Sequence, residues 1–184
     1  LRAQGRHADA LSSLVEGASL REGLGDERGM ASALNMAAAA GRELGDFEVA
    51  VRDFQRASLV FEKLDDIRLQ AVTTTNLAVT YAMKGELDVA GPLFGQALKL
   101  YQAAGDRSGE GIALHNLGFL AGEKGNLAEA EALMRRALAI FYDTGQRVDA
   151  SDVLRDLVKI LMKAGRTAEA ESLEKGAAAL QPQP

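Results

Sequence analysis

Apolar residues recur along this chain at helical spacing, and short polar breaks separate the runs. In the segments 47–61, 113–121 and 127–141, apolar positions follow one another at i, i+3, i+4 and i+7, which places them on one face of an α-helix. In the first of these segments the positions are Phe47, Ala50, Val51, Phe54, Ala57 and Phe61. The pattern therefore predicts a chain built from amphipathic helices.

The breaks between the helical runs repeat every 40 residues. Glycines spaced by this interval are Gly5, Gly45, Gly85, Gly125 and Gly165. An alanine follows each of them five residues later, at Ala10, Ala50, Ala90, Ala130 and Ala170. A second break lies midway, at Gly25-Asp26, Asp65-Asp66, Gly105-Asp106 and Gly145-Gln146. A fixed period of this length is the signature of a stack of repeated helical units.

The break residues predict how each helix ends and the next one begins. Glycine ends a helix readily because it adopts the left-handed conformation at little cost. Asp66 and Asp106 are placed to accept hydrogen bonds from the free amides that open the following helix. Each repeat is thus predicted to be two antiparallel helices, and small residues such as Ala57, Ala97 and Ala137 let neighbouring helices approach closely.

These signals predict a single solenoid over residues 1–180, with repeats 1–24, 25–64, 65–104, 105–144 and 145–180, and a disordered tail over 181–184. The first repeat is expected to be cut, with residues 1–4 ending a first helix and residues 7–22 forming the second. A kink or a late helix start is predicted at Gly91-Pro92, since proline lacks the backbone donor. The last helix is expected from Thr167 to about Leu180, and the chain is expected to be a fragment or a processed product.

Two stretches resemble the tetratricopeptide repeat family. One combines Asn76-Leu77-Ala78, Tyr81, Gly85, Ala90, Phe94 and Ala97; the other combines Asn116-Leu117-Gly118, Gly125-Asn126-Leu127, Ala130, Met134 and Ala137. The resemblance covers Gly5 to about Leu180 in a long variety, with 40 residues in place of about 34, as in LGN/Pins-type adaptors and bacterial multidomain regulators. It implies an all-α, right-handed superhelical α-solenoid of about nine helices.

Composition argues against several classes of function. The net charge is −5 with no long run of Lys or Arg, so nucleic-acid binding is not expected. There is no cysteine and no apolar stretch of membrane-spanning length, which predicts a cytoplasmic protein without disulfides or thiolate metal sites. We found no phosphate-binding glycine motif, and the two histidines, His7 and His115, are too few for a metal site. We therefore expect neither catalysis nor a cofactor; His7 is expected to pack at a helix start.

The resemblance implies that the first helix of each pair lines a concave groove. The expected lining is Ser32, Asn35, Ala39, Arg42 and Glu43; Val72, Thr75, Val79, Ala82 and Met83; Ile112, His115, Phe119, Gly122 and Glu123; and Asp152, Arg155, Lys159, Met162 and Lys163. The candidate peptide-binding residues are Val72, Asn76, Val79, Ile112, His115, Asn116, Phe119, Arg155, Lys159 and Lys163.

Each group of candidates has two interpretations. The apolar members either contact a partner or pack between helices. Asn76 and Asn116 either hold a peptide backbone through their amides or bond neighbouring helices. Arg155, Lys159 and Lys163, spaced by four residues, either pair with acids of a ligand or are simply solvated.

The sequence thus predicts a protein–protein interaction scaffold that binds a peptide or helix in its groove. The alternative is a sensory or regulatory segment of a larger bacterial signalling or transcription-regulating protein. A homodimer through the exposed terminal helices is a separate prediction, because the face bearing Leu11, Leu14, Val15 and Ala18 would lack part of its cover.

Overall fold

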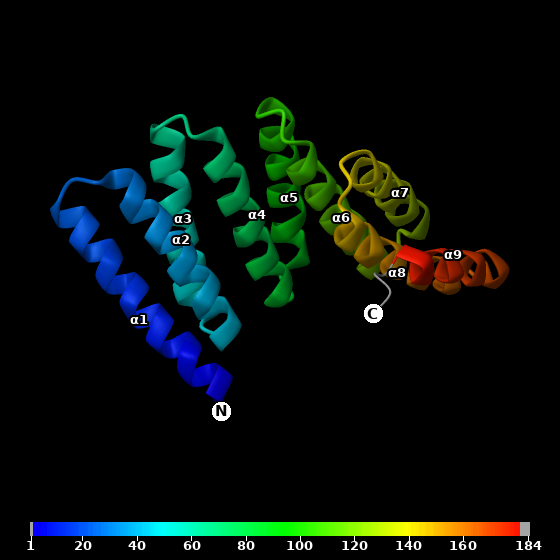
Figure 1. Cartoon of the computed structure of the whole chain (residues 1–184), viewed down its shortest axis with the longest axis horizontal. Helices are drawn as coiled ribbons and strands as arrows, with labels where there is room; N and C mark the ends of the chain where they lie inside the picture. The colour runs from blue at the N-terminus through cyan, green and yellow to red at the C-terminus, as the bar shows by residue number, and fades with distance from the viewer. Residues whose placement is uncertain (1, 181–184) are drawn as a thin grey trace. The chain divides into compact units, whose positions relative to one another are not determined.

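The computed structural model describes the backbone of residues 2–180 and the side chains of residues 11–175. Helices joined by short turns fill this range, and no strand occurs within it (Figure 1). The helices are α1 (Arg2–Gly23), α2 (Glu27–Leu44), α3 (Phe47–Lys63), α4 (Ile67–Met83), α5 (Leu87–Ala103), α6 (Arg107–Glu123), α7 (Leu127–Asp143), α8 (Arg147–Lys163) and α9 (Thr167–Leu180). The all-α class and the number of about nine helices are confirmed for the described residues.

The chain divides into two compact units, Leu1–Ala104 and Gly105–Pro184, here called unit 1 and unit 2. The division falls on the predicted boundary between repeats 65–104 and 105–144. Within each unit, successive helices pack on one another as antiparallel neighbours (Figure 1). The helix pairs are thereby confirmed. A single solenoid over 1–180 remains a prediction, and the tail 181–184 lies outside the described residues.

Helix ends follow the predicted turn chemistry. Gly45, which follows α2, has φ 88°, and its amide bonds back to the carbonyl of Arg42. Asp65 takes the glycine place before α4 with φ 53°, a conformation that aspartate adopts more readily than most residues. The carboxylates of Asp66 and Asp106 accept hydrogen bonds from the amides of Leu69 and Gly109, at 3.2 and 2.9 Å. Both predicted caps are confirmed.

Small residues let the two helices of a pair approach closely. Ala130 and Ala137 of α7 are fully buried, beside large core residues such as Met134 and Phe141. A Cβ added to Gly118 of α6 would lie 2.9 Å from Met134 Cγ and 3.2 Å from the carbonyl oxygen of Ala130. The pair therefore packs with almost no side chain between the backbones at this point.

Two local predictions are wrong. Helix α1 runs from Arg2 to Gly23 without a break at Gly5, because glycine weakens a helix by about 1 kcal/mol without forbidding it. Helix α5 begins at Leu87 and includes Pro92, so there is no late start. Pro92 lies close to the helix start, where its missing amide removes only one intrahelical bond. The predicted kink remains a prediction, and the side chain of His7 lies outside the described residues.

Candidate functional site

The exposed side chains of the first helices form one face on each unit. We call the exposed surface of α2 and α4 the unit 1 face, and that of α6 and α8 the unit 2 face; the two helices of each face contact one another. Of the candidate residues, Val72, Asn76 and Val79 lie on α4. The other seven lie together on α6 and α8: Ile112, His115, Asn116, Phe119, Arg155, Lys159 and Lys163.

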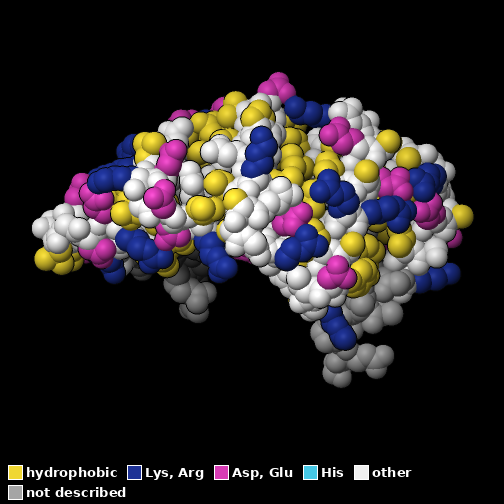
Figure 2. All heavy atoms as spheres, turned by 90° about the horizontal axis from the view of Figure 1, so that it is seen from above, with side chains coloured by type: hydrophobic (Ala, Val, Ile, Leu, Met, Phe, Trp, Pro, Cys, Tyr) yellow, Lys and Arg dark blue, Asp and Glu magenta, His cyan; other side chains and the backbone are white. Residues whose placement is uncertain are grey.

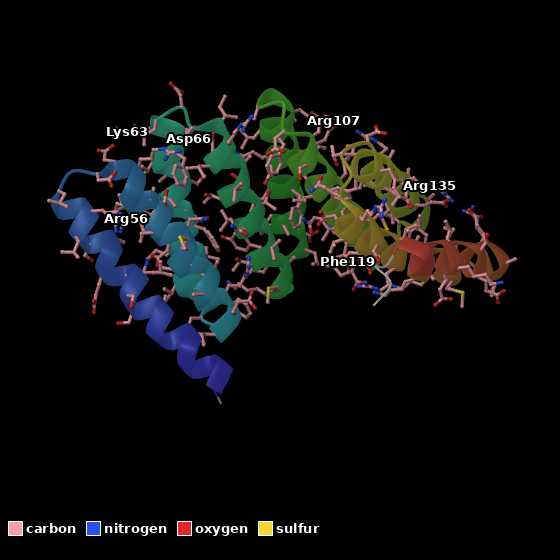
Figure 3. All side chains as sticks on the ribbon, viewed as in Figure 1. Arg56, Lys63, Asp66, Arg107, Phe119 and Arg135 are labelled. Atoms are coloured by element: carbon pink, nitrogen blue, oxygen red, sulfur yellow. The ribbon has the colours of Figure 1, made fainter. Side chains whose placement is uncertain are left out.

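Helix α6 exposes two large apolar side chains on the unit 2 face. Phe119, labelled in Figure 3, is 47% exposed, and Ile112, two turns earlier, is 36% exposed. Asn116 lies between them on the same side of the helix, half-buried, and its side-chain amide has no hydrogen-bond partner among the described residues. On α8 the side chain of Met162 is also exposed. An apolar strip with an unoccupied amide at its centre is suited to binding another chain.

The unit 1 face has the same character. Val72 and Met83 of α4 and Met36 of α2 are exposed, and Val79 is half-buried. The amide of Asn76 has no hydrogen-bond partner in the described part of the chain. Methionine side chains adapt easily to different partners because they are unbranched and polarizable.

Two expected lining residues belong to the helix packing instead. The hydroxyl of Thr75 is buried, donates to the carbonyl of Ala71 at 2.9 Å and lies 3.3 Å from the hydroxyl of Tyr101. Gly122 is buried as well, and a Cβ there would lie 2.4 Å from Ile160 Cδ1. Both positions point toward the next helix, which periodicity alone did not distinguish from the open face.

His115 is bonded within unit 2. Its Nε2 lies 3.0 Å from Asp156 Oδ2 of α8, and both side chains are largely buried. Lys159 donates to the other carboxylate oxygen at 2.6 Å. Hydrogen bonds from His115 and then from Lys159 outweigh burial and lower the pKa of Asp156 to about 2. The sequence interpretation missed this pair; the signal was an acid 41 residues after the histidine, one beyond the repeat period.

The basic stripe on α8 is locally neutralised. Arg155 pairs with Asp152 at 3.0 Å, and Lys159 pairs with Asp156. Lys163 lies 3.5 Å from Glu123 of α6. The three basic side chains stay exposed, and exposed ion pairs are weak enough to exchange partners. The stripe is therefore a charged border of the unit 2 face with no excess of positive charge.

A hollow of about 360 Å³ lies elsewhere on unit 1, between α3 and α5. The buried residues Thr74 and Leu77 of α4 form its floor, and Leu59 and Leu93 form its apolar walls. Sequence reasoning missed it because its lining comes from three separate helices. The lining residues are Gln55, Ser58, Leu59, Thr74, Leu77, Leu93 and Gln96.

Other kinds of site were sought in the described part of the chain. It contains no cluster of three His, Cys, Asp or Glu side chains able to hold a metal ion. None of its helices combines the length and apolar character needed to cross a membrane. On the surface seen in Figure 2, basic and acidic side chains are scattered among hydrophobic ones.

Comparisons with known proteins agree with this fold. The family model described as tetratricopeptide repeat matches residues 29–103 and 69–143, which together make up more than half of the chain. A comparison with curated proteins gives no match.

Solved structures with the same fold include three of different kinds. BtubC (BKLC) from P. vanneervenii is 18% identical, with TM-score 0.74 over 100% of this chain and 92% of that one. A Rap protein in complex with competence and sporulation factor is 19% identical, with TM-score 0.80 over 97% of this chain and 51% of that one. A signal transduction ATPase with numerous domains and a tetratricopeptide repeat sensor, from Pyrococcus horikoshii, is 19% identical, with TM-score 0.75 over 84% and 24%.

This chain thus spans about half of the Rap protein and a quarter of the ATPase. At these identities the likeness concerns the fold alone. Together, the 40-residue helix pairs and the family match show that the chain belongs to the tetratricopeptide repeat family.

Proposed function

We propose that this chain is a non-catalytic protein-interaction scaffold that binds a peptide or an amphipathic helix on its first-helix faces. The observation that carries the proposal is the strip Ile112–Asn116–Phe119 on α6. It exposes two large apolar side chains on either side of an amide without a partner in the described chain. Covering such a strip would remove apolar surface from water, at roughly 25 cal/mol per Å².

The amides give the face a way to bind backbone as well as side chains. Each asparagine side chain offers a donor and an acceptor, which matches the amide and carbonyl of an extended peptide. Asn76 and Asn116 occupy the same place in successive repeats, and neither is used within the described protein. His115, by contrast, is engaged with Asp156, so its role is to hold α6 and α8 together beside the binding strip.

The likeness to a Rap protein supports a peptide as ligand. That protein is described in complex with competence and sporulation factor. For the present chain, a peptide of this general kind on either face is part of the proposal. So are a cytoplasmic location, a bacterial origin and the long repeat variety found in LGN/Pins-type adaptors.

A second candidate function is a sensory or regulatory segment of a larger bacterial signalling or transcription-regulating protein. The observation in its favour is the likeness to a multidomain ATPase with a tetratricopeptide repeat sensor, of which this chain covers only 24%. A nucleotide-binding or DNA-binding domain encoded in the same gene would support this function.

Affinity capture from native lysate, followed by mass spectrometry, tests the scaffold function. Phe119→Ala and Asn116→Ala are expected to weaken capture of the same partner by about tenfold or more, since central apolar and polar anchors dominate interfaces. Tyr142→Ala is the matched control, because Tyr142 is an exposed aromatic residue on the second helix α7. Circular dichroism should show unchanged helicity in all three variants. Capture that survives both substitutions on α6 would show that this strip is not the binding site.

A further inference from the structure

The guanidinium of Arg42 has almost no acceptor within the described chain. Arg42 lies in the last turn of α2, and its side chain is only 14% exposed. Its Nε and Nη1 are enclosed and have no hydrogen-bond partner. Its Nη2 lies 3.4 Å from Glu43 Oε1, a long contact to the next residue in the chain. Charge-assisted hydrogen bonds are normally shorter, at about 2.7–2.9 Å.

Other arginines in the described chain are paired the opposite way. Arg28 and Arg135 are far more exposed, yet they reach acids at 2.8 and 2.6 Å. Desolvation penalises a buried charge much more than an exposed one, so the enclosed arginine is the one that needs an acceptor most. The negative end of α2 helps to balance the positive charge of Arg42, but it leaves the donors on Nε and Nη1 unsatisfied.

The repeat shows that the fold does not require arginine at this place. The residues 40, 80 and 120 positions later are Ala82, Gly122 and Met162. Two of these have little or no side chain, and the third is apolar. Arg42 is therefore a departure from the repeat, and specificity in a repeat protein is carried by such departures.

A second polar group without a partner lies on the same side of α2. The Oδ1 atom of Asn35 is enclosed and accepts no hydrogen bond. Asn35 precedes Arg42 by two helical turns, about 10 Å at 1.5 Å per residue. Ala39 lies between them and presents only a methyl group, so a chain could approach the helix closely. Met36 and Met83 are exposed nearby on α2 and α4.

We infer that the unit 1 face holds a peptide carboxylate on Arg42, with a backbone amide of the same peptide donating to Asn35. One guanidinium beside the acid Glu43 suits a single negative charge, and its planar donors match the two oxygens of a carboxylate. An extended peptide advances about 3.3–3.6 Å per residue, so three residues span the interval between Arg42 and Asn35. This inference rests on the proposed function, because it names the ligand chemistry of one of its two faces.

NMR of the arginine Nε–H groups in the full chain tests the inference without a known partner. The probes are acetyl-aspartic acid amide, which carries a side-chain carboxylate, and acetyl-alanine, which carries a terminal one. The neutral control probe is acetyl-asparagine amide. The Arg42 signal is expected to move with one or both carboxylates and to stay fixed with the control. The carboxylate that binds more tightly tells an internal acid from a chain terminus.

Two substitutions separate a binding role from a structural one. Arg42→Met places here the residue found at position 162, and it should weaken carboxylate binding by about tenfold or more, with an equal or higher midpoint of thermal unfolding. Arg56→Met, at an exposed arginine of α3 paired with Glu22, should leave carboxylate binding unchanged. An Arg42 signal that no carboxylate moves, or an Arg42→Met variant that is less stable, would overturn the inference.

The same data separate this inference from the proposed function. Phe119→Ala lies on unit 2 and should leave the response of Arg42 to carboxylates intact. If partner capture survives Phe119→Ala and Asn116→Ala while Arg42 binds carboxylates, the α6 strip is refuted and the Arg42 site stands. If capture depends on the α6 strip and Arg42 ignores carboxylates, the reverse holds.

Discussion

The imidazole of His115 and the carboxylate of Asp156 lie 3.0 Å apart and join α6 to α8 across the unit 2 face. Lys159 binds the second oxygen of the same carboxylate at 2.6 Å. The helices that present Phe119 and the charged border are thus fixed to one another by a largely buried polar contact. Its strength depends on the ionisation of Asp156.

We expect this contact to make stability depend on pH under acidic conditions. The pKa of Asp156 is about 2 in the folded protein, below the ordinary value of 3.8. The folded state therefore favours the ionised carboxylate, so its contribution is present above pH 4 and is lost as the pH falls toward 2. Urea unfolding at pH 5 should show Asp156→Asn to be less stable than the parent chain. The gap should narrow between pH 4 and pH 2, and a gap of constant size would contradict the assignment.

The helix caps should differ in what they contribute. Asp106→Ala removes the bond to the Gly109 amide and should lower the free energy of unfolding by about 1 kcal/mol. Asp66→Ala should have a larger effect, because Asp66 also accepts two hydrogen bonds from Arg28, at 2.8 and 3.0 Å. Asp46 caps α3 without a side-chain bond and is the matched control, with an expected effect within about 0.5 kcal/mol. Chemical denaturation measures all three, and equal effects at Asp46 and Asp106 would count against the capping bond. Figure 3 labels Asp66 at the turn before α4.

Two glycine substitutions should have opposite signs. Gly118→Ala would place a Cβ 2.9 Å from Met134 and 3.2 Å from the backbone of Ala130, so it should destabilise by about 1–3 kcal/mol. Gly95→Ala lies inside α5 with open space around the added atom, so it should stabilise by about 0.5–1 kcal/mol. Thermal unfolding of the two variants compares them directly. A stabilised Gly118→Ala variant would show that the two helices do not pack as closely as described.

Self-association through α1 remains a prediction. Leu20 and Leu24 at the end of this helix are 70% and 83% exposed, and Val15 is exposed as well. Sedimentation velocity at increasing concentration should show a dimer, and Leu20→Glu should weaken it because the substitution would bury a charge. A single monomeric species at all concentrations would rule the dimer out. Asp88→Ala on α5 controls for a general effect of changing the surface charge.

The sequence alone determined the helices and their pairing. The 40-residue period, the turn glycines and the capping residues Asp66 and Asp106 are local signals, because backbone conformation and first-turn hydrogen bonds depend on a few neighbouring residues. Gly5 and Pro92 were misjudged for the same reason: a local signal shifts a preference that a longer helix can override.

Only the tertiary structure decided which first-helix residues are available. Thr75 and Phe119 both fall on the expected lining, yet one is buried against Tyr101 and the other is exposed. Periodicity defines a helix face to within about one residue, and the neighbouring helix decides which edge of that face it covers. The bond between His115 and Asp156 and the enclosed, unpaired donors of Arg42 likewise depend on how side chains meet in space. Those contacts, and not the repeat that positions them, distinguish the binding surfaces of this chain from its scaffold.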